Sequence, residues 1–255
     1  MSGNCDTGLP AIWRDTPNFQ PRRNGMVPTI LLMHYTGMEN AKAALDLLCH
    51  KDSNVSCHYL VDEDGQIIQM VAESQRAWHA GHSYWAGERD INSCSIGIEI
   101  VNQGHNPLPN DFPERQISAV MALAKDIIKR HSILPPNVIA HSDIAPARKK
   151  DPGEKFPWAR LHENGIGHFV EPVALQGDRG HYIGDDHEDV ERARKLLVQY
   201  GYLIEAGRSF DERDAQLIAA FQRHFRPQKV DGRLDQSTLE TLEKLIGALP
   251  VAPIS

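Results

Sequence analysis

Apolar and polar residues follow two different patterns along the chain. From residue 26 to about 160, short apolar runs typical of strands are interleaved with stretches in which apolar residues recur every three or four positions, as on one face of a helix. From about residue 186 onward only the helical pattern occurs. Between the two regions lies a stretch rich in glycine and acidic residues that has no period, which is typical of a linker.

Strands are predicted in the first region only, at residues 29–33, 57–61, 66–71, 95–101 and 138–140. The first of these runs is continuously apolar, which suits a strand that is buried on both faces. The second and third flank Asp64-Gly65, a strong signal for a hairpin turn. In the fourth, Ile96, Ile98 and Ile100 share one face, so the strand presents its other face to different surroundings.

Helices are predicted over residues 40–50 and 113–131, and over three shorter stretches near the C-terminus. Asp211 and Asp235 are suited to cap two of these stretches, and Gly201 to end the other. The predicted fold is an α/β domain with a central mixed β-sheet flanked by helices, followed by a small three-helix domain. We place the first domain at 1–172, with an N-terminal arm over about 1–25, the linker at 173–185 and the C-terminal domain at 186–255.

Polar residues that could carry chemistry lie within or directly after apolar strands. His34 and His141 each follow an apolar run, and Glu99 interrupts another on the face opposite its isoleucines. Asp151 lies ten residues after His141 in a loop that can turn back. Two imidazoles and a carboxylate suit zinc and leave a fourth position for water. The alternative is two satisfied core histidines and a turn aspartate, which spacing alone favours for any one of them.

Two further features near these residues have both a functional and an ordinary interpretation. Lys149 could stabilise an oxyanion as a fixed positive charge, or belong to a solvated basic turn. The segment around Trp78 and His79 could line a groove and stack on sugar rings, or simply pack on the sheet.

Composition narrows the possibilities for the 255-residue chain. Its net charge of −7 argues against nucleic-acid binding, which needs a basic patch. No apolar run approaches the roughly 20 residues of a membrane span. The four cysteines form no C-x-x-C pair, so we expect reduced thiols rather than a thiolate zinc site. The first residues lack the pattern of a secretory signal, so we expect a cytoplasmic protein, with the periplasm as the alternative.

The order of several motifs resembles the type 2 N-acetylmuramoyl-L-alanine amidases, zinc hydrolases of peptidoglycan. The matching segments together cover about residues 25–165 and are ILLMHYTGM at 30–38, SCHYLVDEDGQIIQMV at 56–71, RAWHAG at 76–81, INSCSIGIEIVN at 91–102 and AHSDIAPARKKDPG at 140–153. The C-terminal region resembles a three-helix peptidoglycan-binding domain through LLVQYGY at 196–202, FDERDAQLIAAFQRHF at 210–225 and VDGRLDQSTLETL at 230–242.

This resemblance implies a role for each candidate residue. It assigns His34, His141 and Asp151 to zinc, Glu99 to general acid–base catalysis and Lys149 to the active site. It places Trp78 and Tyr35, and with them His79, among the candidate substrate contacts. The implied reaction is hydrolysis of the amide between the lactyl group of N-acetylmuramic acid, in its ordinary or anhydro form, and L-Ala of the stem peptide. The implied partners are peptidoglycan or muropeptides, with no protein partner.

Other functions remain open from the sequence. A non-catalytic peptidoglycan recognition protein has the same fold, although the presence of every ligand and catalytic position favours an enzyme. A hydrolase acting on another amide and a protein-binding adaptor are further alternatives. The sequence does not distinguish intact peptidoglycan from soluble anhydromuropeptides, and it reveals neither stem-peptide specificity nor oligomeric state.

Overall fold

A computed structural model describes residues 5–250 of the protein. Its strands are β1 Ala11–Trp13, β2 Phe19–Pro21, β3 Ile30–Tyr35, β4 Tyr59–Val61, β5 Ile67–Gln69, β6 Gln75–Ala77, β7 Ser95–Ile100 and β8 Val138–Ala140. Its α-helices are α1 Ala41–Leu48, α2 Ile91–Cys94, α3 Glu114–His131, α4 His141–Ile144, α5 Trp158–Glu163, α6 Glu188–Tyr200, α7 Glu212–Phe225 and α8 Gln236–Gly247. Two 3-10 helices cover Arg23–Gly25 and Pro135–Asn137.

The predicted mixed sheet is confirmed. Six strands run in the order β1-β5-β4-β7-β3-β8, and β5 pairs antiparallel with β4 as the hairpin signal predicts. The pairs β4–β7, β7–β3 and β3–β8 are parallel. A separate two-stranded sheet joins β2 to β6. The first predicted strand extends beyond its apolar run: the prediction ended at residue 33, whereas β3 also includes His34 and Tyr35.

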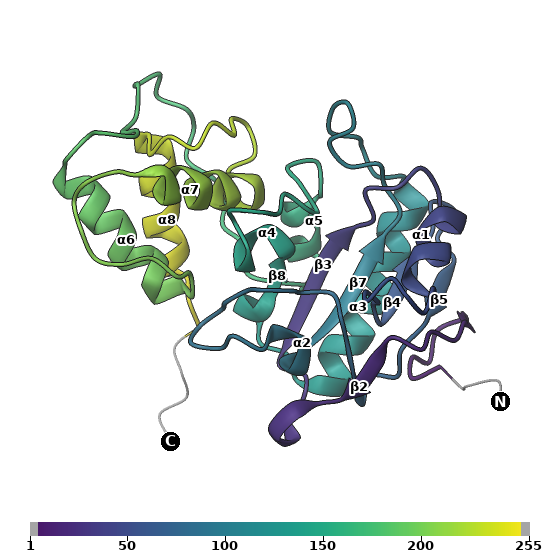
Figure 1. Cartoon of the computed structure of the whole chain (residues 1–255). Coiled ribbons are helices and arrows are strands. Elements are labelled where there is room, and N and C mark those ends of the chain that lie inside the picture. Colours follow the sequence, from purple (N-terminus) through teal and green to yellow (C-terminus); the bar gives the residue numbers. More distant parts are fainter. Residues whose placement is uncertain (1–4, 251–255) are drawn as a thin grey trace.

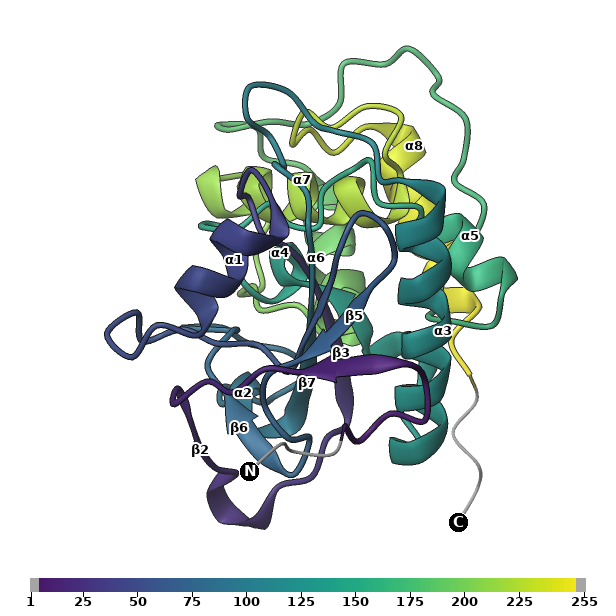
Figure 2. The same ribbon diagram turned by 90° about the vertical axis from the view of Figure 1, so that its right-hand side faces the viewer.

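The two faces of the sheet are covered by different helices. On β4, Tyr59 and Val61 belong to the same core cluster as the apolar face of α3, whereas Leu60 packs in a second cluster with α1. This alternation is what a strand buried on both faces produces. Figure 2 shows α1 and α3 on opposite sides of the sheet.

The three predicted C-terminal helices are also confirmed, together with their caps. The side chains of Asp211 and Asp235 accept backbone hydrogen bonds at the starts of α7 and α8, and Gly201 ends α6 with φ of 135°. In Figure 1 these helices lie to one side of the sheet, with α4 between them and β3. Apolar residues of both regions form one continuous core, which the modest apolar content of the C-terminal region alone did not predict.

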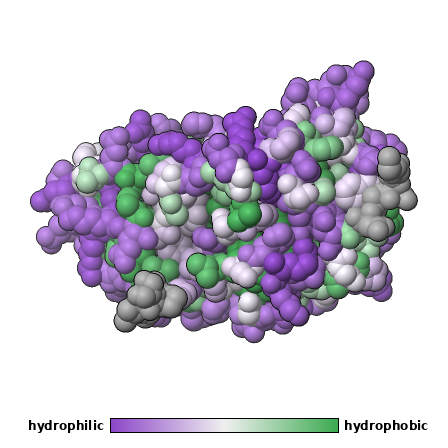
Figure 3. Space-filling model, turned by 90° about the horizontal axis from the view of Figure 1, so that it is seen from below, coloured by the Kyte–Doolittle hydropathy of each residue, from purple (hydrophilic) through white to green (hydrophobic). Residues whose placement is uncertain are grey.

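Among the described residues, no helix combines the length and apolarity needed to cross a membrane. On the face shown in Figure 3, apolar residues form small groups separated by hydrophilic ones. Such scattered apolar exposure is ordinary for a folded domain.

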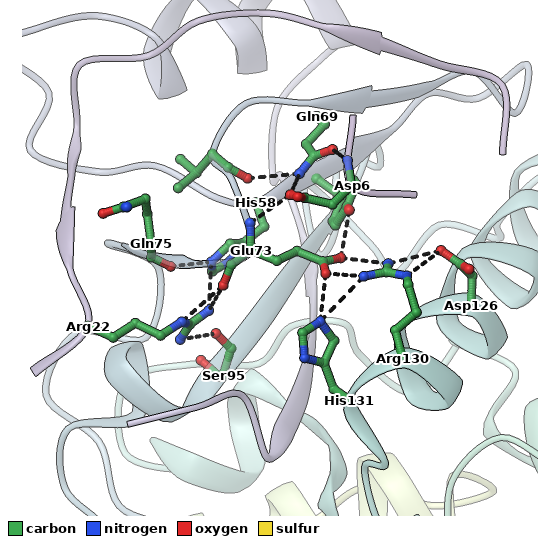
Figure 4. Close-up of polar contacts among 12 residues, drawn as sticks. Asp6, Arg22, His58, Gln69, Glu73, Gln75, Ser95, Asp126, Arg130 and His131 are labelled. Atoms are coloured by element: carbon green, nitrogen blue, oxygen red, sulfur yellow. Dashed lines mark hydrogen bonds and ion pairs between the residues drawn. The ribbon is translucent and has the colours of Figure 1, made fainter. Parts of the chain in front are cut away.

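A buried ion-pair network holds the N-terminal arm, the hairpin and the end of α3 together (Figure 4). Glu73 is 4% exposed, and its carboxylate accepts hydrogen bonds from Arg130, His131 at 2.6 Å and the Tyr59 hydroxyl at 2.6 Å. Burial by itself raises the pKa of Glu73, but these donors outweigh it and lower the pKa to about 2.

This lowered pKa predicts how the Glu73→Gln variant responds to acid. A carboxyl with a folded-state pKa near 2 and an ordinary unfolded pKa near 4.5 contributes about 3 kcal/mol above pH 4.5 and loses it as the pH falls toward 2. We expect urea unfolding at pH 7 to show a loss of about 2–3 kcal/mol in the variant. Its stability should also fall less between pH 4.5 and 2.5 than that of the wild type. Parallel pH profiles would contradict the assignment.

Candidate active site

The predicted ligand residues meet at the carboxyl ends of two neighbouring parallel strands, β3 and β8. His34 lies in β3, and His141 directly follows β8, whose Ala140 pairs with Met33 of β3. Parallel strands bring such ends to one edge of a sheet, where sites commonly form. The backbone N–H of Ser142 donates to the carbonyl of Asp151 at 3.0 Å, so the loop after α4 returns to the same point.

The three donor atoms form a nearly equilateral triangle. His34 Nδ1 lies 2.9 Å from His141 Nδ1 and 3.1 Å from Asp151 Oδ2, and the remaining distance is 2.9 Å. The residues are only 1%, 2% and 5% exposed, respectively. Together they form a buried His-His-Asp group that suits a metal ion.

The electrostatics favour the protonation states that a metal requires. Burial, together with the nearby His141, lowers the pKa of His34 to about 4, so its imidazole is neutral at neutral pH. Burial alone raises the pKa of Asp151, but the charges and hydrogen bonds of the two histidines outweigh it and hold that pKa well below the ordinary value. Neutral imidazoles and an ionised carboxylate are the forms that bind cations.

Glu99 lies directly beside His34. The two residues are register partners on β7 and β3, so their side chains leave the same face of the sheet, which is the face covered by α1. Oε2 of Glu99 is buried and has no hydrogen-bond partner among the described residues. Burial, strengthened by the charge of Asp151, raises the pKa of Glu99 well above its usual value, with Lys149 opposing. An acidic group in this state is suited to move protons.

A groove of about 230 Å³ opens over these residues. Its lining combines sheet residues, α1 and the loops: Tyr35, Thr36, Met38, Ala44, Leu47, Leu48, Val55, Ser56, Trp78, His79, Glu99, His141, Lys149 and Asp151. The structure therefore brings seven of the eight predicted site residues to one groove, and His34 lies in contact with its lining. The apolar wall from α1 was not among the predicted site residues, because nothing in its spacing distinguishes it from an ordinary core-facing helix.

Two of the predicted contacts have unexpected surroundings. His79 Nδ1 lies 2.9 Å from His34 Nε2, and its other ring nitrogen lies 3.2 Å from Ser95 Oγ, so His79 holds the ring of the candidate ligand His34 in place. Such support behind a ligand histidine is common in metal sites. The Tyr35 hydroxyl lies 3.0 Å from His105 Nδ1, and burial raises its pKa to about 12.

Asp143 is a buried residue beside the site that the sequence did not single out. It lies two residues after His141 on α4, and its carboxylate accepts the Ala140 N–H at 2.8 Å, the Tyr202 hydroxyl at 2.7 Å and His224 Nδ1 at 2.7 Å. Tyr202 and His224 come from the C-terminal region. The helix that begins with the candidate ligand His141 is thus held from the second domain, which no local pattern could indicate.

Comparisons with known proteins agree with this geometry. A family model of N-acetylmuramoyl-L-alanine amidases matches residues 24–154, and one of a putative peptidoglycan binding domain matches residues 186–242. The N-acetylmuramoyl-L-alanine amidase AmiD of Escherichia coli is 38% identical over 85% of this chain and 82% of its own length. The 1,6-anhydro-N-acetylmuramyl-L-alanine amidase AmpD of the same species is 32% identical over 57% of this chain and 87% of its own.

Solved structures are similar across both domains. E. coli AmiD in complex with an anhydro-N-acetylmuramic acid tripeptide superimposes with a TM-score of 0.74 at 37% identity, covering 92% of this chain and 93% of that one. AmpDh3 from Pseudomonas aeruginosa gives a TM-score of 0.74 at 35% identity, covering 90% and 95%. With its buried His-His-Asp group, adjacent glutamate and matching second domain, the chain belongs to the N-acetylmuramoyl-L-alanine amidase family.

Proposed function

We propose that this amidase is zinc-dependent and cleaves the amide between the lactyl group of N-acetylmuramic acid, including its 1,6-anhydro form, and L-Ala of the stem peptide. The observation that carries the proposal is the triangle of His34, His141 and Asp151, whose sides measure 2.9–3.1 Å. Tetrahedral zinc with bonds of about 2.0–2.1 Å keeps its ligand atoms about 3.3 Å apart, so these donors fit the ion with little movement.

The residues around the triangle divide the chemistry between them. Bound zinc would supply Lewis acidity, polarising the scissile carbonyl and favouring ionisation of water. Glu99 takes a proton from the attacking water and delivers it to the departing amine of L-Ala as the C–N bond breaks. Lys149, in the same groove, places positive charge where the carbonyl oxygen becomes negative. The products are a lactyl carboxylate and a free peptide amine.

Substrate binding is assigned to the groove and to the second domain. Trp78 and Tyr35 line the groove and offer aromatic surface for the sugar and peptide. Two structures support an anhydromuropeptide substrate: the complex of AmiD and that of AmpDh3 with an anhydromuramic pentapeptide, which superimposes with a TM-score of 0.73 at 33% identity. The C-terminal domain, matching a putative peptidoglycan binding family, would hold the enzyme on the wall.

Metal removal tests the proposal. We expect chelation to abolish the release of stem peptide from a purified anhydromuropeptide, and added zinc to restore it. Mass spectrometry measures the released peptide. His34→Ala should lower bound zinc below one tenth of a molar equivalent by elemental analysis, because one of three ligands is lost. His50→Ala, an exposed histidine outside the groove, is the matched control and should keep its zinc.

The competing function, a non-catalytic peptidoglycan receptor, predicts a different result. Such a protein would pellet with insoluble wall yet release no peptide in either the zinc-loaded or the chelated state. Zinc-independent release of peptide would contradict the metal assignment while leaving the amidase activity intact.

A further inference from the structure

A second cavity lies between the two domains. It measures about 510 Å³ and is larger than the catalytic groove. One wall comes from residues 82–84 and Arg89, a second from α4 and the loop that follows it, and the third from residues 203–205 and the start of α7. Figure 1 shows α4 and α7 side by side, and the hydrogen bond between Asp143 and His224 joins them. The cavity therefore exists only because the C-terminal domain is docked.

A single ridge separates this cavity from the catalytic groove. Trp78 and His79 line the groove, whereas His82 lines the cavity. In the same way Lys149 faces the groove and its neighbour Arg148 faces the cavity. The Arg148 guanidinium donates to the carbonyls of Ala80 and His82, which ties the two sides of the ridge together. Because neighbouring residues lie 3.8 Å apart along the chain, the two hollows adjoin.

The ridge is also built for close approach of Arg148. Gly81 has φ of +61°, and a Cβ placed there would come within 2.9 Å of Arg148 Nη2. A side chain at this position would be strained and would displace the guanidinium. The conformation of Gly81 therefore fixes the position of Arg148 in the ridge.

The cavity combines an apolar floor with a cationic rim. Ile144 and Leu217 are buried beneath it, and Leu203 is 53% exposed at its edge. Arg89 lies over the Tyr84 ring at 5.3 Å, and Arg213 projects from the first turn of α7. Among the described residues, neither arginine has a carboxylate within ion-pair distance. The lining contains two acidic residues, Glu205 and Asp143, and the carboxylate of Asp143 is already occupied by its three hydrogen bonds.

We propose that this interdomain cavity binds a second stem peptide of polymeric peptidoglycan, through its carboxylates, while another stem occupies the catalytic groove. The inference rests on the proposed function. A peptide with aliphatic side chains and free carboxylates complements both the floor and the two available guanidinium groups. A cavity of this volume accommodates a short peptide segment. Its position across one ridge from the scissile bond suits a polymer, in which stems occur repeatedly.

The test compares two substrates in the full-length, zinc-loaded enzyme. Arg89→Glu/Arg213→Glu should lower kcat/KM on insoluble wall about tenfold relative to kcat/KM on a soluble anhydromuropeptide that carries one stem. The wild-type preference for wall should also weaken as salt rises, because exposed charges are screened. Arg115→Glu, an exposed arginine on α3 with no side-chain partner among the described residues, is the matched control.

Binding without turnover separates this inference from the proposed function. With chelator present, wild type and Arg115→Glu should pellet with wall, and the double variant should pellet about tenfold less at equal concentration. The second stem site would be overturned if the double variant matched the control in two measurements: the ratio of kcat/KM on wall to kcat/KM on the soluble substrate, and the fraction that pellets with wall. Absence of peptide release by the wild type from both substrates would instead overturn the proposed chemistry. Equal unfolding midpoints of all variants would exclude misfolding as the cause.

Discussion

Replacing Glu99 with glutamine is expected to reduce turnover by about 10²–10⁴-fold while leaving bound zinc near one equivalent. Glutamine has nearly the same shape but neither accepts nor returns a proton at this position. The metal should remain, because the three donor atoms contact one another without Glu99. The measurement is the rate of peptide release from a soluble anhydromuropeptide, paired with elemental analysis of the same preparation.

The matched control is Glu63→Gln, which changes an exposed carboxylate in the turn between β4 and β5. It should match the wild type in both measurements. Turnover by Glu99→Gln within a factor of three of the wild type would show that Glu99 is not the proton carrier. Loss of zinc in that variant would show that the carboxylate is instead part of the metal site.

Replacing Asp143 with alanine is expected to destabilise the whole chain by about 3–5 kcal/mol. The substitution leaves the Tyr202 hydroxyl, His224 Nδ1 and the Ala140 N–H without their common acceptor in a buried region. A buried donor that loses its acceptor keeps the cost of leaving water. For a chain of this size we expect the midpoint of thermal unfolding to fall by about 10 °C, measured by circular dichroism.

Asp52→Ala, an exposed loop aspartate whose carboxylate has no hydrogen-bond partner among the described residues, should leave the midpoint unchanged. Tyr202→Phe removes only one donor and should cost about 1–2 kcal/mol. Unfolding of Asp143→Ala in two well-separated transitions, with the first domain at its wild-type midpoint, would contradict the shared role of this contact.

The continuous core explains why the two domains are expected to unfold together. Trp85, from the first domain, packs against Tyr200 and Tyr202 of the second, and Trp158 stacks on His224 with ring centroids 3.8 Å apart. The C-terminal helices therefore stabilise the catalytic domain in addition to the anchoring role proposed for them.

Local elements were predictable where one periodic signal dominated. The helix over 113–131 and the hairpin around Asp64-Gly65 have clear apolar periods and turn residues, and both are present. The short strands β1, β2 and β6 were not predicted, because they form by pairing with partners that are distant in the sequence. The helix α5 was also missed, since six residues span fewer than two turns and show no helical period.

The sequence by itself determined the family and the sheet-and-helix architecture and predicted the candidate site residues, because each depends on residue type and on local or ordered motifs. Only the tertiary structure decided that His34, His141 and Asp151 meet within about 3 Å, that His79 contacts His34 and that Asp143 joins the domains. These are contacts between residues up to 117 positions apart. Chain topology and packing bring such residues together, and neither leaves a repeating signal along the sequence.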